Sequence, residues 1–171
     1  MFKNAKRAAE MILTHENDSI NIVSHMDPDG ITAAAIISKA LDRKDIRNHV
    51  KFVQMLYPEV IDELEVGELT IFTDLGSSQL GNLRPKFGNN DVIIADHHSP
   101  EKEGEWSKLV HFNAHLENLD GVEEISGAGM AYLIAKELDK ENKPLAALAL
   151  IGAIGDIQNG WGKLKGYNRK I

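Results

Sequence analysis

The sequence predicts an α/β domain, in which a mainly parallel β-sheet is flanked by helices on both faces. Short apolar runs alternate with segments of helical periodicity, which is the pattern of βαβ units. The run at 91–95 is apolar after its first residue, as in a strand that is covered on both faces of a parallel sheet. The 171 residues suffice for one domain with its own core. Because no repeat or low-complexity linker divides the chain, residues 1–171 are expected to form that single domain.

The expected elements follow one another closely. Residues 1–18 should form an amphipathic N-terminal helix, because their apolar residues recur at helical spacing among charged ones. Strands are expected at 19–24, 50–54, 69–73, 91–95 and 108–112, and a polar loop at 99–105. Further helices are expected at 31–41 and 58–64, and a short helix should follow an N-cap at Ser77 or Ser78. Two more are expected, one at 130–138 after a glycine-rich turn and one at 145–154 with Pro144 in its first turn. The helix at 145–154 is apolar nearly all round and should therefore be buried.

Composition narrows the possible functions. The chain has no cysteine, which excludes disulfides, thiolate metal sites and a cysteine nucleophile. We find neither a signal peptide nor an apolar run that approaches the roughly 20 residues of a membrane span, so we expect a cytoplasmic protein without a membrane partner. The formal charge of −7 argues against a polyanionic partner, but bound cations neutralise carboxylates locally. Residues 161–171 also carry four basic residues and no acid, so a nucleic-acid partner stays open.

Acidic and imidazole side chains follow the ends of several apolar elements. The first strand runs into His25, Asp27 and Asp29, and the third ends at Asp74. The fourth strand ends at Asp96, His97 and His98, and the last helix ends at Asp156. The carboxyl ends of parallel strands share one edge of a sheet, where open α/β sheets bind their ligands. Each segment alone could be a capped strand end, but four such placements favour a functional cluster.

The ligand chemistry of this cluster favours metal binding. Carboxylates and imidazoles without sulfur suit Mn²⁺ or Mg²⁺ before Zn²⁺. The candidates exceed what one ion needs, so Asp74 could bridge two ions about 3.5–4 Å apart, the arrangement used for displacement at phosphorus. Backbone amides at Gly30 and in the turn 127–129 could approach a phosphate. Of the other histidines, we expect His111 to be packed in a strand, whereas His115 could approach the cleft.

The ordered motifs resemble those of the DHH phosphoesterase superfamily. They are His25-Met-Asp27-Pro-Asp29-Gly30, Asp74, Asp96-His97-His98 and Gly152-Ala-Ile-Gly155-Asp156, and they cover roughly residues 20–160. The segments Ser126-Gly-Ala-Gly129 and Gly162-Lys-Leu-Lys-Gly166-Tyr-Asn168-Arg169 resemble its RecJ branch, in particular the archaeal RecJ-like nucleases. Each motif is weak alone, but the ordered set is highly specific.

The resemblance implies roles for the cluster. One ion would take His25, Asp27 and Asp74, and a second ion would share Asp74. The other ligands of the second ion would be Asp29, His97 and Asp156. Asp96 would orient an imidazole, and His98 would face the scissile phosphate as a charge stabiliser or proton donor. Mn²⁺ is the expected metal, with Mg²⁺ possible.

The resemblance also implies a reaction. We expect a metal-dependent phosphodiesterase, a RecJ-like exonuclease that hydrolyses single-stranded nucleic acid by a two-metal mechanism. The pyrophosphatase branch has a longer spacing than His25-x-Asp27-x-Asp29, which points away from pyrophosphate. One alternative is a phosphoesterase for short oligonucleotides or nucleotides. The other is a replication scaffold like Cdc45, which would bind GINS-type partners; such scaffolds tend to lose metal ligands, and here all are present.

Two departures from the family pattern stand out. RecJ-like chains commonly read Asn-Pro where this one reads Asn113-Ala114, although no proposed ligand is affected. The sequence also stops soon after the fourth motif, whereas the family continues into a second, substrate-binding domain. We therefore expect this chain to be a truncated one that contains the N-terminal DHH domain alone.

Overall fold

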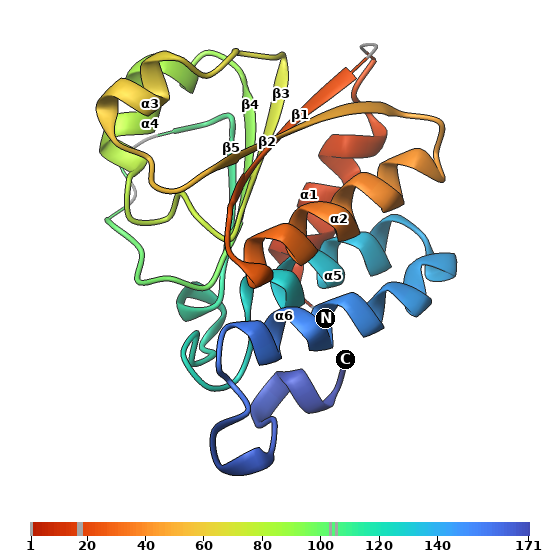
Figure 1. Ribbon diagram of the computed structural model, residues 1–171. Coiled ribbons are helices and arrows are strands. Elements are labelled where there is room, and N and C mark those ends of the chain that lie inside the picture. Colours follow the sequence, from red (N-terminus) through yellow and green to blue (C-terminus); the bar gives the residue numbers. More distant parts are fainter. Residues whose placement is uncertain (1, 17–18, 103, 105) are drawn as a thin grey trace.

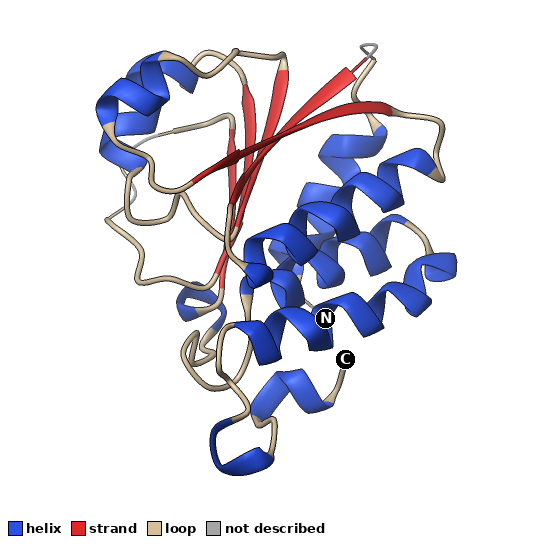
Figure 2. Ribbon diagram, viewed as in Figure 1, coloured by secondary structure: helices blue, strands red, loops and turns tan. Residues whose placement is uncertain are grey.

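The computed structural model describes residues 2–16, 19–102, 104 and 106–171. A sheet of five parallel strands runs through it in the order β2-β1-β3-β4-β5, with helices on both faces (Figures 1 and 2), which confirms the predicted fold class. The strands are β1 (Ser19–His25), β2 (Arg47–Val53), β3 (Leu69–Thr73), β4 (Asp91–Asp96) and β5 (Leu109–Asn113). The helices are α1 (Lys3–Leu13), α2 (Pro28–Asp42), α3 (Pro58–Asp62), α4 (Leu80–Phe87), α5 (Gly127–Leu138) and α6 (Ala146–Gly155).

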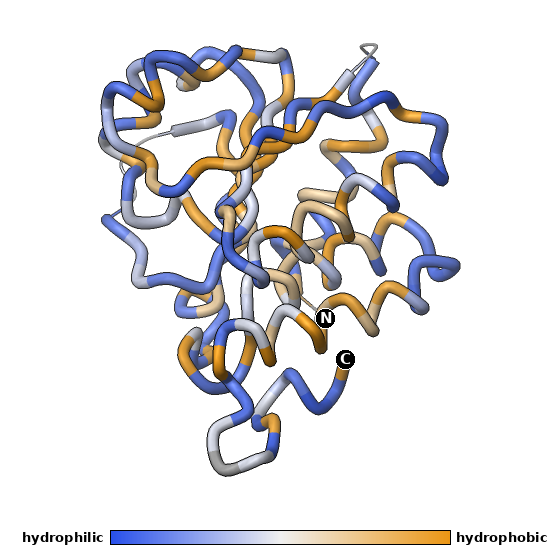
Figure 3. The backbone as a smooth tube through the Cα atoms, viewed as in Figure 1, coloured by the Kyte–Doolittle hydropathy of each residue, from blue (hydrophilic) through white to orange (hydrophobic). Residues whose placement is uncertain are grey.

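Two hydrophobic cores lie on opposite faces of the sheet. Alternate strand residues supply them: Ile22, Ile71 and Ile93 face one core, whereas Phe72 and Ile94 face the other. The larger core lies beneath α1, α2, α5 and α6, and the smaller one beneath α3 and α4 (Figure 1). Hydrophobic residues are therefore concentrated between the sheet and the helices, as the colouring of Figure 3 makes visible.

Strand order places a topological switch point between β1 and β3. The chain leaves β1 through α2 to reach β2 on one side, and leaves β3 through α4 to reach β4 on the other. Right-handed crossovers in opposite directions put α2 and α4 on opposite faces, which opens a crevice at the carboxyl ends of β1 and β3. The register pairs Ser24 with Thr73 and Thr73 with Ala95, so the next residues of these strands meet at this crevice.

Helix starts follow local sequence signals. Asp27 caps α2 by accepting a hydrogen bond from the Gly30 backbone N–H at 2.8 Å, and Pro28 occupies the first turn. Helix α2 therefore begins before the predicted residue 31 and takes Asp29 into its first turn. Ser126 caps α5 in the same way through the Gly129 N–H. In α1, a stripe of small and apolar residues faces the core, as its periodicity predicts.

Three local predictions were wrong. Helix α6 is not buried all round: Ile151 and Ile154 are about half exposed, because α6 packs on α2 and α5 from outside and α5 takes the buried position instead. Neither Ser77 nor Ser78 caps α4, which starts after Gln79. Pro144 lies in a 3₁₀ segment (Lys140–Leu145) that precedes α6.

Some boundaries also differ from the predictions. Strand β2 starts at Arg47 rather than at 50, and its residues are mostly exposed because it is the edge strand beside β1. Residues 103 and 105 of the polar loop predicted at 99–105, and residues 1, 17 and 18 of the predicted N-terminal helix, lie outside the described residues. In the described part of the chain, no helix is both long and apolar enough to cross a membrane.

Candidate metal centre

The predicted cluster assembles at the crevice between β1 and β3. His25 is the last residue of β1, Asp74 follows β3, and Asp96 is the last residue of β4. Three helices add carboxylates or support them: α2 brings Asp29, α6 ends next to Asp156, and α5 points its N-terminus at Asp29. Residues that lie far apart in sequence therefore meet at one edge of the sheet, as the strand-end pattern predicts.

Three side chains form the part of the cluster next to β1. The Nδ1 atom of His25 lies 3.1 Å from Asp27 Oδ2 and 3.5 Å from Asp74 Oδ2. Asp74 is buried, whereas His25 and Asp27 are partly open to solvent. One donor atom from each of the three lies within 4.8 Å of the others, which is compatible with a shared cation.

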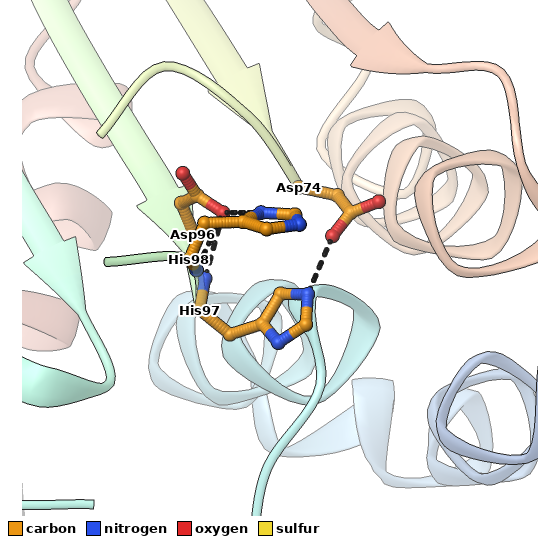
Figure 4. Close-up of side chains that lie close together, drawn as sticks. All are labelled: Asp74, Asp96, His97 and His98. Carbon is orange, nitrogen blue, oxygen red and sulfur yellow. Dashed lines mark hydrogen bonds and ion pairs between the residues drawn. The ribbon is translucent and has the colours of Figure 1, made fainter. Parts of the chain in front are cut away.

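A second group lies behind Asp74. The Nε2 atom of His97 lies 3.1 Å from Asp74 Oδ1 (dashed line in Figure 4) and 3.7 Å from Asp29 Oδ2. The Nδ1 atom of the same ring lies 3.8 Å from Asp156 Oδ2. Asp29, His97 and Asp156 also bring donor atoms within 4.8 Å of one another. Asp74 therefore stands between two groups and directs one oxygen to each.

The backbone at Asp74 has an unusual conformation. Its φ angle is +59°, in the left-handed region that Asp and Asn tolerate better than most residues. Its N–H donates to the Ala95 carbonyl at 2.9 Å, which holds the turn against β4. A Cβ at Gly127 would collide with the Asp74 carboxylate, so the glycine lets α5 approach it closely.

Several buried polar atoms of the cluster have no hydrogen bond within the described structure. They are both carboxylate oxygens of Asp74, the Nε2 atom of His97 and the Nδ1 atom of His25. Leaving such atoms unpaired costs free energy, and they face one another across ion-pair distances. Because these four atoms of three residues converge without hydrogen-bond partners, the residues fit a divalent cation.

The pKa shifts of the cluster also indicate that it favours bound positive charge. Burial and the charge of Asp74 raise the pKa of Asp29 to about 8. Ion pairing with Asp74 and Asp27 raises the pKa of His25 to about 9. Burial opposes protonation of His97, but Asp74 and Asp29 nonetheless raise its pKa to about 10. Burial raises the pKa of Asp156 as well. Protons therefore supply positive charge to this acidic site, and a bound cation would displace them.

Asp96 is completely buried and directs its oxygens at protein donors. Its Oδ1 accepts from the N–H groups of His97 at 2.7 Å and His98 at 3.2 Å, and lies 2.8 Å from His98 Nδ1 (Figure 4). Its Oδ2 accepts from the Ser77 N–H at 3.0 Å. Burial would raise the pKa of Asp96, but the His98 hydrogen bond holds it below the ordinary value. The same bond raises the pKa of His98.

A buried polar network behind Asp96 was missed by sequence reasoning. The Oγ atom of Ser77 lies 2.8 Å from His111 Nε2 and accepts from Asn113 Nδ2 at 2.8 Å. Asn113 Nδ2 also donates to the His98 carbonyl at 2.8 Å. His111 is buried in β5, as predicted. The residue type of Ser77 predicts a helix cap, whereas its role depends on a contact with β5 that no local pattern reveals.

The expected phosphate contacts of backbone amides are contradicted. The Gly127 N–H donates to Asp29 Oδ2 at 2.6 Å and the Ala128 N–H to Asp29 Oδ1 at 3.0 Å, while Gly30 is engaged by Asp27. The start of α5 thus binds a carboxylate of the protein itself, because the helix dipole and free amides favour any anion placed there.

Two open cavities border the cluster. One, of about 160 Å³, is lined by His25, Asp74 and His98 together with residues such as Met55 and Gln79. The other, of about 280 Å³, lies on the far side of the two histidines, and its lining includes His115 and Asp156. His115 therefore approaches the cleft, which the sequence had left open.

Gln158 is a further residue that sequence reasoning missed. It is buried, and its Nε2 atom donates to Asp156 Oδ2 at 2.8 Å and to the Gly121 carbonyl at 2.8 Å. The Gly121 carbonyl lies 2.5 Å from His97 Nδ1 as well. In the sequence, only its position two residues after Asp156 points to Gln158, and this spacing is not specific to any kind of site.

Comparisons with known proteins match this site and fold. The profile of the DHH family, N-terminal domain, matches residues 19–155. An uncharacterised protein of Methanocaldococcus jannaschii is 35% identical over 99% of this chain and 39% of its own length. The single-stranded-DNA-specific exonuclease RecJ of Thermus thermophilus is 28% identical over 99% of this chain and 27% of its own length.

A solved structure agrees with the same relationship. A crystal structure of exonuclease RecJ bound to manganese superposes with a TM-score of 0.79 and 26% identity, over 99% of this chain and 46% of that one. The chain therefore spans less than half the length of each of these three proteins.

Proposed function

Because this chain belongs to the DHH family and is RecJ-like in sequence and fold, we propose that it is a metal-dependent phosphodiesterase that acts on single-stranded nucleic acid as an exonuclease. One observation carries the proposal: two groups of ligand-capable side chains share Asp74, which directs one oxygen to each. The proposed substrate is that of the Thermus thermophilus relative, a single-stranded-DNA-specific exonuclease.

We assign His25, Asp27 and Asp74 to one divalent ion, and Asp29, Asp74, His97 and Asp156 to the other. The oxygen-rich donor set suits Mn²⁺, with Mg²⁺ as the alternative. When bound, such a pair offsets negative charge on phosphoryl oxygens and lowers the pKa of a water. The residues themselves provide convergent ligands, of which Asp29, Asp74 and His97 are buried, and their positions are set by α2, α6 and the ends of three strands.

His98 has a separate role in the proposal. Its Nδ1 atom is engaged by Asp96, which leaves Nε2 available in a half-exposed ring that lines the 160 Å³ cavity. Asp96 raises the pKa of His98, so the ring is more often protonated near neutral pH than a free histidine. A protonated Nε2 can donate a hydrogen bond to a phosphoryl oxygen or a proton to the leaving oxygen.

The small cavity favours a second candidate function. Its volume of about 160 Å³ is below the roughly 300–1,000 Å³ of common ligand pockets, which favours a small phosphoester. A phosphoesterase for short oligonucleotides or nucleotides would not need a groove longer than this cavity. Comparing a dinucleotide with a long single strand of the same sequence separates the two: the exonuclease retains its rate on the long strand.

The test of the proposal uses labelled single strands and Mn²⁺. We expect metal-dependent release of mononucleotides by the wild-type protein and loss of that activity in Asp74→Asn. Asparagine suits the left-handed backbone at this position, so the variant removes charge without straining the turn. Arg47→Ala, on the exposed edge strand, is a control outside the cluster. Equal activity in Asp74→Asn and the wild type would refute the proposal.

A further inference from the structure

Gln158 links two of the candidate metal ligands, Asp156 and His97. Its side chain is 4% exposed, and its single amide nitrogen donates to both Asp156 Oδ2 and the Gly121 carbonyl. That carbonyl lies 2.5 Å from His97 Nδ1 and so fixes the orientation in which His97 Nε2 faces Asp74. One amide group therefore restrains a carboxylate directly and an imidazole through one carbonyl.

The amide of Gln158 can perform this role in only one of its two orientations. Its nitrogen lies among three acceptors, because the Ile125 carbonyl is also near, at 3.3 Å. If the amide were turned round, its oxygen would face those acceptors without a donor. On its other side, Asn168 Nδ2 donates to Gln158 Oε1 at 2.6 Å. The three acceptors direct the oxygen of Gln158 away from the cluster, and the hydrogen bond from Asn168 stabilises that orientation.

Asn168 belongs to a 3₁₀ turn (Gly166–Arg169) that is held against the loop 121–126. Its side chain is 1% exposed, and its N–H donates to the Glu124 carbonyl at 2.8 Å. Gly166 has a φ of +49° and lies so close to Glu124 that a Cβ would collide with it. Tyr167 packs edge-on against Phe2, with ring centroids 5.1 Å apart. The turn is thus anchored on both sides of Asn168.

We propose that Gln158 and Asn168 are positioning residues for the metal ligands Asp156 and His97. Gln158 leaves the second carboxylate oxygen of Asp156 available, holds the acceptor of His97, and is itself oriented by Asn168. The inference rests on the proposed metal site but not on the substrate or the reaction. Partners of this kind typically change metal affinity by about 10–100-fold when they are removed.

The experiment measures Mn²⁺ binding by titration calorimetry, together with the thermal midpoint of the metal-free protein. Gln158→Met keeps an unbranched side chain without donors, and Asn168→Asp keeps the shape but removes the donor to Gln158. We expect each to weaken one of two Mn²⁺ sites by about 10–100-fold and to spare the other. The added charge of Asn168→Asp by itself would favour a cation, so weaker binding isolates the effect of orientation.

Asn142→Asp is the matched control. Asn142 is also a buried amide; it donates to the Ala135 carbonyl at 2.8 Å near the C-terminal end of α5 and accepts from Arg43 at 2.8 Å. We expect this variant to leave both Mn²⁺ affinities unchanged. The double variant Gln158→Met/Asn168→Asp should bind no more weakly than Gln158→Met, since Asn168 acts through Gln158.

The outcomes separate this inference from the proposed function. Wild-type affinity in Gln158→Met, an equal loss in Asn142→Asp, or additive losses in the double variant would overturn it. A wild-type protein that binds two Mn²⁺ ions but hydrolyses no nucleic acid would refute the function alone. A wild-type protein that binds no Mn²⁺ would refute both.

Discussion

His97 and His98 are adjacent in sequence, and their ring centroids lie only 4.3 Å apart, yet they address different carboxylates. His97 directs Nε2 at Asp74 from a buried position, whereas His98 turns Nδ1 to Asp96 and leaves about half of its side chain exposed (Figure 4). The difference arises because the chain leaves β4 at Asp96, whose Oδ1 binds both following N–H groups and so folds the two residues into a tight turn.

This divergence predicts separate effects of two matched variants. His97→Gln should weaken Mn²⁺ binding by more than the roughly 10–100-fold typical of outer-shell partners, because a proposed ligand is lost. His98→Gln should leave the metal affinity unchanged and slow cleavage by about 10²–10⁴-fold, the usual contribution of a proton donor. Calorimetric titration and initial rates at saturating Mn²⁺ measure the two effects. If both variants lost metal alike, the division of roles would be wrong.

Asp96→Asn should change the pH dependence of cleavage. The hydrogen bond from His98 to Asp96 raises the pKa of His98, so its removal lowers that pKa towards the ordinary value. If activity requires a protonated His98, the alkaline limb of the rate profile moves to lower pH in the variant. The shift is measured from rates at saturating Mn²⁺ between about pH 5 and about pH 9, on both sides of the ordinary histidine pKa of about 6.5. His98→Gln is the control, and its profile should lack this limb; an unmoved limb in Asp96→Asn would assign it to another group.

The sequence predicted the sheet and the cluster well because both follow from local patterns. Continuous apolar runs such as β3 and β4 identify central strands, and the residues after them meet wherever parallel strands share an edge. The structure brings these side chains together around Asp74, whereas their division between two ions stays a prediction.

What the sequence could not predict depends on tertiary contacts. Ser77 has the residue type of a helix cap, but its N–H is taken by Asp96 and its hydroxyl by β5. The amides at the start of α5 have the geometry of a phosphate site, but Asp29 reaches them from a segment almost 100 residues away. The apolar helix α6 lies outside α5, which no periodicity indicates. In each case a distant residue decides between two locally equal alternatives.

The stability of the metal-free protein should fall as the pH rises above neutrality. The pKa values of His25 and His97 rise from 6.5 to about 9 and about 10 on folding, and that of Asp29 rises from 3.8 to about 8. A group whose pKa is raised in the folded state stabilises the protein below its unfolded pKa, and this contribution is lost as the pH rises through the folded value. The folded protein thus holds these extra protons at low pH and releases them as the pH rises through about 8 for Asp29 and about 10 for His97.

The measurement is the thermal midpoint in excess EDTA between about pH 6.5 and about pH 10, a window that runs from the ordinary histidine pKa to the raised pKa values of His25 and His97. Each kcal/mol of stability lost lowers the midpoint by about 2–4 °C in a domain of this size. With saturating Mn²⁺ the decline should shrink or reverse, because a cation binds the deprotonated ligands and adds stability by mass action. His97→Gln in EDTA should decline less steeply than the wild type, since it lacks one of the titrating groups. A midpoint that rises with pH in EDTA would contradict the assignment, because it would mean that the unfolded chain, not the folded site, holds the additional protons.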